Sequence, residues 1–111
     1  RGPADARPRF LFEKEGIFMV TSIIHAYRDD PRLRQSFNRL ARDTFGLDFE
    51  PWYQNGFWGG QYDPWSLLLD GEIAANVSVN RIDCLLDGQR RQYLQLGTVM
   101  TRADLRGWGR R

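Results

Sequence analysis

The chain has 111 residues, of which 41% are hydrophobic and 27% charged, a composition typical of a single globular domain. One cysteine and one histidine exclude an internal disulfide framework, a cysteine-based zinc site and a multi-histidine metal site. The longest strongly apolar run, residues 17–20, is too short for a transmembrane helix, and no N-terminal stretch has the pattern of a signal peptide. We therefore expect a cytoplasmic protein that does not enter a membrane.

The charge is nearly balanced. Lysine and arginine total 16 and aspartate and glutamate 14, for a net charge of +2. The two signs are interspersed along the chain, so the sequence contains no long basic stripe. Aromatic side chains beside arginines can stack nucleic-acid bases, but no repeated arginine–aromatic spacing supports such a role here. We expect no nucleic-acid partner.

The first 18 residues have no hydrophobic periodicity. They contain Pro3, Pro8 and mixed charges, which predicts a disordered tail. Alternatively, the codons of residues 14–16 can read as a ribosome-binding sequence just before Met19, and residues 1–18 are then a translated leader. Residues 19–111 form the expected domain, and its end just after a glycine-rich stretch predicts the N-terminal half of a larger one.

A strand and two helices are predicted next. Residues 17–27 are apolar and β-branched, which indicates a strand. An acidic N-cap before Pro31 predicts a helix over 31–45 that ends at Gly46. The arginines of this helix mostly occupy its outer faces, and its apolar face consists of Leu33, Phe37, Leu40 and Ala41. A shorter helix is predicted over 49–55.

The second half of the chain changes to strand periodicity. Asp70-Gly71 and Asp87-Gly88 are two-residue hairpin signals, because a type I′ turn needs positive φ at both positions. They separate three predicted antiparallel strands at 65–69, 72–86 and 89–101. The expected fold is α+β (mixed α/β), in the order strand, helix, helix and three-stranded antiparallel meander.

A glycine-rich loop follows the last strand. A strand that runs into such a loop makes an anion site, because the loop amides point at the ligand and no Cβ holds a phosphate away. The run Arg106-Gly107-Trp108-Gly109 is also compatible with a plain surface turn. Its position after a meander favours the anion site.

The order of elements and this loop resemble the first half of the GNAT superfamily of acyl-CoA-dependent N-acetyltransferases, over about residues 20–109. The family's pyrophosphate motif is Arg/Gln-x-x-Gly-x-Gly/Ala; Arg106 matches its first position and Gly109 its fourth, while Arg111 departs from its sixth. The stretch from Phe45 to Thr101 is also similar to a bacterial subgroup of this family. The resemblance implies a GNAT-like fold whose C-terminal half is missing from this chain.

The resemblance also implies a function: transfer of an acetyl group from acetyl-CoA to an amine-bearing acceptor. Backbone groups of the last strand would hold the pantetheine arm, and the loop after it the pyrophosphate. Carried onto this sequence, the cofactor residues are Met100, Thr101, Arg106, Gly107, Trp108, Gly109 and Arg111. No catalytic residue can be assigned and no metal is implied. Because the C-terminal half is missing, we expect the chain alone to be inactive.

Eight of the fifteen aromatic residues lie between Phe45 and Trp65. They form either a core cluster over the sheet or a wall for the acceptor substrate. The second interpretation predicts substrate contacts at Trp52, Tyr53, Trp58 and Tyr62. The single histidine, His25, is interpreted as structural, since no partner can be named for it.

The competing function is a non-catalytic interaction module. Residues 93–101 are predicted to form an open sheet edge with unpaired backbone groups and apolar side chains. Such an edge promotes association with another strand, so we expect self-association as a further property of the chain.

Overall fold

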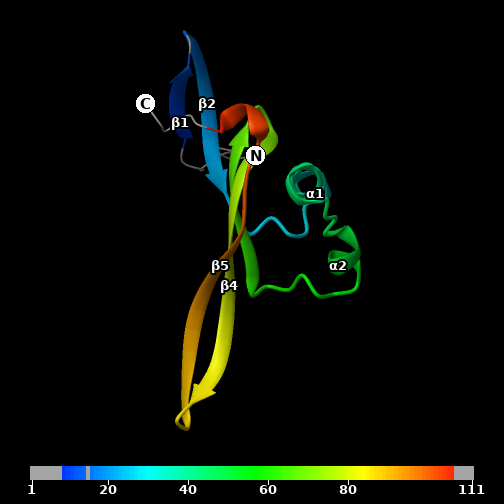
Figure 1. Cartoon of the computed structure of the whole chain (residues 1–111), viewed down its shortest axis with the longest axis vertical. Helices are drawn as coiled ribbons and strands as arrows, with labels where there is room; N and C mark the ends of the chain where they lie inside the picture. The colour runs from blue at the N-terminus through cyan, green and yellow to red at the C-terminus, as the bar shows by residue number, and fades with distance from the viewer. Residues whose placement is uncertain (1–8, 15, 107–111) are drawn as a thin grey trace, which may run out of the picture.

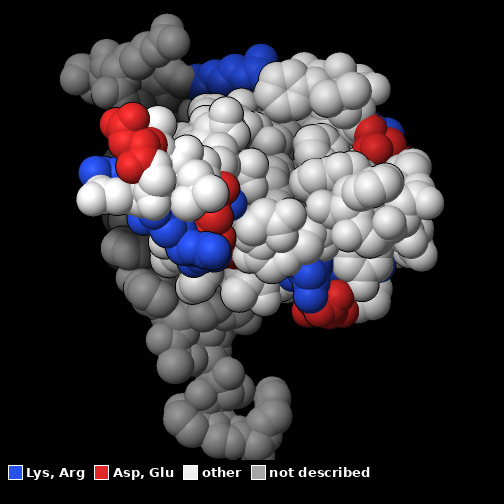
Figure 2. Space-filling model, turned by 90° about the horizontal axis from the view of Figure 1, so that it is seen from below, with Lys and Arg blue, Asp and Glu red and all other residues white. Residues whose placement is uncertain are grey.

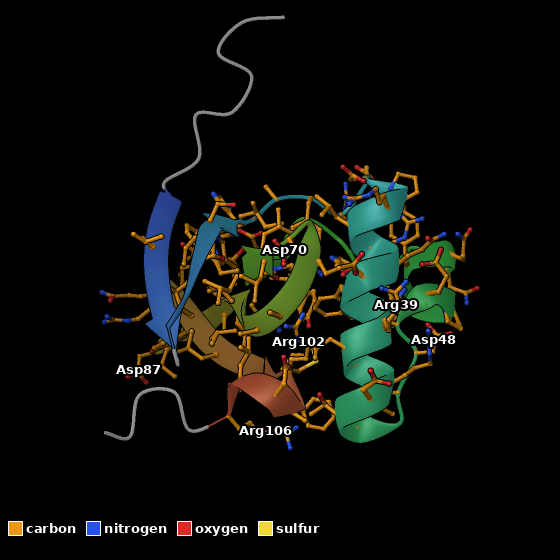
Figure 3. All side chains as sticks on the ribbon, turned by 90° about the horizontal axis from the view of Figure 1, so that it is seen from above. Arg39, Asp48, Asp70, Asp87, Arg102 and Arg106 are labelled. Carbon is orange, nitrogen blue, oxygen red and sulfur yellow. The ribbon has the colours of Figure 1, made fainter. Side chains whose placement is uncertain are left out.

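A computed structural model describes residues 9–14 and 16–106. The fold of these residues is mixed α+β, as predicted: one antiparallel sheet in the order β1-β2-β3-β4-β5, with both described helices on one face (Figures 1 and 3). The elements are β1 Arg9–Lys14, β2 Ile17–Ile24, α1 Pro31–Phe45, α2 Glu50–Gln54, β3 Tyr62–Leu69, β4 Glu72–Leu86, β5 Gln89–Thr101 and a 3-10 turn at Ala103–Leu105.

Local signals define α1, and its predicted bounds are confirmed. The Asp30 side chain accepts hydrogen bonds from two first-turn amides, Pro31 occupies the first turn, and Gly46 ends the helix at φ +71°. The predicted apolar face is confirmed as well. Phe37 and Ala41 are fully buried, and they pack with other core residues between α1 and the sheet.

Both predicted hairpins are confirmed, with β4 and β5 at the predicted bounds. All four turn residues have positive φ: +52° and +77° at Asp70 and Gly71, +53° and +76° at Asp87 and Gly88. Pairing of β4 with β3 ends at Asn80. Residues 81–86 therefore pair only with residues 89–94 of β5. These two segments form a two-stranded arm that extends from the sheet (Figure 1).

The strands differ from the prediction in three places. Residues 9–14, part of the predicted tail or leader, form β1 and pair with β2; residues 1–8 lie outside the described part. The strand predicted over 17–27 ends at Ile24. The strand predicted from Trp65 begins at Tyr62 and includes Pro64. Proline fits there because β2 pairs only with residues 66–69 of β3, which leaves the proline side of the strand without a ladder partner.

Candidate functional site

A bulge interrupts β5 close to its C-terminal end. Asn76 pairs with Met100 and Ser78 with Gly97, so Val77 faces two residues of β5. One of these is Thr98, whose φ of +48° is in the left-handed region that residues other than glycine rarely adopt. A bulge leaves backbone groups without their ladder partners and re-aims the neighbouring strand. The irregularity therefore marks a place where β5 can offer main-chain groups to a ligand.

Buried side chains hold this bulge. The amide of Asn76 donates to the carbonyl oxygen of Thr98 at 2.9 Å and to the Ser78 hydroxyl at 2.9 Å. Ser78 donates to the Tyr62 hydroxyl at 2.9 Å, which lies 2.7 Å from the Thr98 hydroxyl. Burial raises the pKa of Tyr62, so its hydroxyl keeps its proton. The bulge is thus fixed by β3 and β4 and not by β5 alone.

The cofactor residues predicted from the resemblance lie just after the bulge, as far as they are described. Met100 is buried in the core beside α1. Arg106 follows the 3-10 turn, and its Nε donates to the carbonyl oxygen of Thr101 at 3.1 Å (Figure 3). The structure therefore brings Thr101 and Arg106 together. Four further predicted residues lie outside the described part: Gly107, Trp108, Gly109 and Arg111.

The four aromatic residues predicted to contact substrate lie in one cluster. Trp58 is only 2% exposed and its ring centroid lies 6.2 Å from those of Trp52 and Tyr53 and 5.6 Å from that of Tyr62. Trp58 packs in the core, where its indole nitrogen has no hydrogen-bond partner among the described residues. Trp52, Tyr53 and Tyr62 are half-buried around it. The cluster joins α2 and the following loop to the sheet, and substrate contact stays a prediction.

A groove that the sequence does not reveal lies where β2 leaves β3. Because β2 ends at Ile24, residues 62–65 of β3 have no partner strand on that side among the described residues. The space of about 890 Å³ is lined by the segment between β2 and α1, by the start of β3 and by Arg81 of β4. This volume is within the range of small-molecule sites.

A histidine–aspartate pair lies in this groove. Nδ1 of His25 is 3.0 Å from an oxygen of Asp63, whose other oxygen accepts the Ala26 amide at 2.8 Å. The His25 ring stacks on Trp65, with centroids 3.8 Å apart and planes 7° from parallel. Ala26 has a φ of +56°. The interpretation of His25 as structural stays a prediction; its partner could not be found from the sequence, because Asp63 is 38 residues away and no spacing rule connects the two.

No known family, curated protein or solved structure matches the chain. Within residues 9–14 and 16–106, no helix is long and apolar enough to span a membrane. Among the same residues, no three histidine, cysteine or carboxylate side chains gather as metal ligands do. On the face seen in Figure 2, basic and acidic side chains lie next to each other in a few small groups, and uncharged residues separate these groups.

Proposed function

We propose that this chain belongs to a GNAT-type N-acetyltransferase, which transfers an acetyl group from acetyl-CoA to an amine. The observation that carries the proposal is the bulge at Thr98 in β5, fixed from two neighbouring strands and followed by Thr101 and Arg106. Further support comes from the order of elements, since the resemblance implies strand, helix, helix and an antiparallel meander ending in an anion-binding loop.

The proposed reaction needs a backbone N–H group that the sheet does not use, and a bulged strand can provide one. The amine nitrogen attacks the thioester carbonyl carbon, the carbon–sulfur bond breaks, and the coenzyme leaves as a thiolate that takes up a proton. Negative charge develops on the carbonyl oxygen during this step, and a backbone N–H aimed at it stabilises the transition state. The unpaired backbone at residues 98–99 is the proposed donor, Thr101 the proposed contact for the pantetheine arm, and Arg106 the first of the pyrophosphate contacts.

Acetyl-CoA binding by the full-length product of the native gene tests the proposal. Amide resonances of residues 98–101 should shift saturably on addition of acetyl-CoA, while those of the 81–86 arm should not. Val99→Asp places a negative charge beside a polyanionic ligand. A unit charge about 10 Å from another, at an effective dielectric constant of about 20, contributes roughly 1.7 kcal/mol, so affinity should fall more than tenfold.

Leu94→Asp is the matched control, because Leu94 and Val99 lie on the same strand and are 65% and 62% exposed. The control should leave affinity unchanged. Equal affinity of the two variants, or shifts confined to the arm, would refute the proposed cofactor site.

A second candidate function is an interaction module. In the described sheet, β5 is an edge strand, and Leu94, Leu96 and Val99 on it are 62–67% exposed. Exposed edges with apolar side chains promote association. Sedimentation should detect a concentration-dependent dimer that Leu96→Lys weakens. A stable monomer at micromolar concentrations excludes this candidate.

A further inference from the structure

The hydrogen bonds of His25 determine which of its ring nitrogens carries the proton. Both oxygens of the Asp63 carboxylate act as acceptors, one for the Ala26 amide and the other for Nδ1. The neutral imidazole must therefore carry its hydrogen on Nδ1, which leaves Nε2 as an acceptor. Nε2 has no hydrogen-bond partner among the described residues, and the His25 side chain is 45% exposed.

Three contacts hold the ring in one orientation. Trp65 stacks on one face, Asp63 fixes the Nδ1 edge, and the Ala26 amide in turn fixes Asp63, whose side chain is only 9% exposed. Ala26 adopts its left-handed backbone conformation between β2 and α1, and such strain concentrates at functional sites. The pair has the geometry of a proton acceptor with its orienting carboxylate.

The charged side chains that line the groove differ in how many hydrogen bonds and ion pairs they make. Asp29 accepts hydrogen bonds from a tyrosine hydroxyl and from Arg28, and Asp30 caps α1. Asp63 is bonded as described above. Arg28 pairs with Asp29 and donates to a carbonyl oxygen. Arg81, by contrast, has no carboxylate partner among the described residues, and its guanidinium makes one 3.5 Å contact with a carbonyl oxygen. The lining thus carries three carboxylates and two guanidinium groups, and its least satisfied charged group is the Arg81 guanidinium.

We propose that this groove is a binding site for a small molecule with an anionic group, a carboxylate or a phosphate. Arg81 pairs with the anionic group, and Nε2 of His25 accepts a hydrogen bond from an N–H or O–H group of the same molecule. None of the lining residues belongs to β5 or follows it, so the groove shares no residue with the proposed acetyl-CoA contacts; Tyr62, which also lines it, bonds to the Thr98 hydroxyl of the bulge.

The position of the proton is testable directly. The chain has a single histidine, so nitrogen-15 spectra of the ring are unambiguous. In the neutral ring, the hydrogen should be on Nδ1. In Asp63→Asn, the amide oxygen can still accept from Ala26 while its NH₂ group donates to Nδ1, so the hydrogen should move to Nε2. A wild-type ring with the hydrogen on Nε2 overturns the proposal, whether or not the variant folds.

Binding is tested with inorganic phosphate and with acetate as probes on the full chain. At least one should shift the His25 ring signals saturably, and the tighter of the two identifies the class of anion. Arg81→Gln should weaken that binding about tenfold or more, because a hydrogen bond to a charged group is lost. Arg90→Gln, on the exposed arm, is the control and should have no effect. If neither anion shifts the ring signals saturably, or if the two arginine variants bind alike, the proposal is overturned.

Discussion

Asn76→Ala should be among the most destabilising polar substitutions in this protein. Asn76 is 3% exposed, and its side chain accepts from Ser66 at 2.7 Å and donates to Ser78 and to the Thr98 carbonyl, each at 2.9 Å. Each hydrogen bond contributes about 1 kcal/mol net, and a buried group left without a partner costs about 1–3 kcal/mol. The expected loss is about 3 kcal/mol, a large fraction of the roughly 5–15 kcal/mol that stabilises a domain.

Urea unfolding measures this loss as a lower midpoint at an unchanged slope. Asn80→Ala is the matched control: it lies on the same strand and face, is half-buried, and makes one 3.5 Å contact with Gln95. The control should lose less than about 0.5 kcal/mol. If Asn76→Ala also loses less than about 1 kcal/mol, the buried network does not hold the bulge and the reasoning fails.

Further substitutions test the helix layer. Phe37→Ala removes a fully buried ring that contacts Phe49 and Trp58 and should cost about 3–5 kcal/mol in unfolding free energy. Asp30→Ala removes the cap of α1 and should cost about 1 kcal/mol by the same assay. Hydrogen bonding to Arg34 lowers the pKa of Glu50 below its ordinary 4.5, so this contribution to stability is present above that pH and lost as pH falls. The free energy of unfolding should therefore fall less steeply with decreasing pH in Glu50→Gln than in the wild type. Parallel curves for the two proteins would contradict this prediction.

Elements defined by neighbouring residues could be predicted from the sequence. The bounds of α1 follow from Asp30, Pro31 and Gly46, and the two hairpins follow from Asp-Gly pairs whose positive φ is a local requirement. Strand β1 has no such signal. Its residues 9–14 mix charged and apolar types, and the strand is defined by its pairing with β2. Pairing is a property of two segments, and one segment alone does not specify it.

Contacts between residues of different elements could not be predicted, because no local pattern encodes them. Arg34 was expected on an outer face of α1, but it is 8% exposed, pairs with Glu50 at 2.8 Å and lies over the Tyr53 ring. Its partner comes from α2, which must dock before the arginine can be buried. The His25–Asp63 pair likewise requires β2 to end beside β3. Sequence spacing identifies neither pair.

The network that holds the bulge and the histidine–aspartate pair lie on opposite faces of β3. Tyr62 and Ser66 join the network that holds the bulge, whereas Asp63 alternates with them and points to the other face, where it holds His25. Tyr27 and Tyr62 also line the groove, but Tyr27 bonds to Ser66 at 2.7 Å and Tyr62 to Ser78 at 2.9 Å, so both belong to the network. Asn76→Ala should therefore shift the amide resonance of Thr98 while the His25 hydrogen stays on Nδ1, because no bond of the histidine–aspartate pair passes through Asn76. A change of both signals would show that the bulge and the groove are one site.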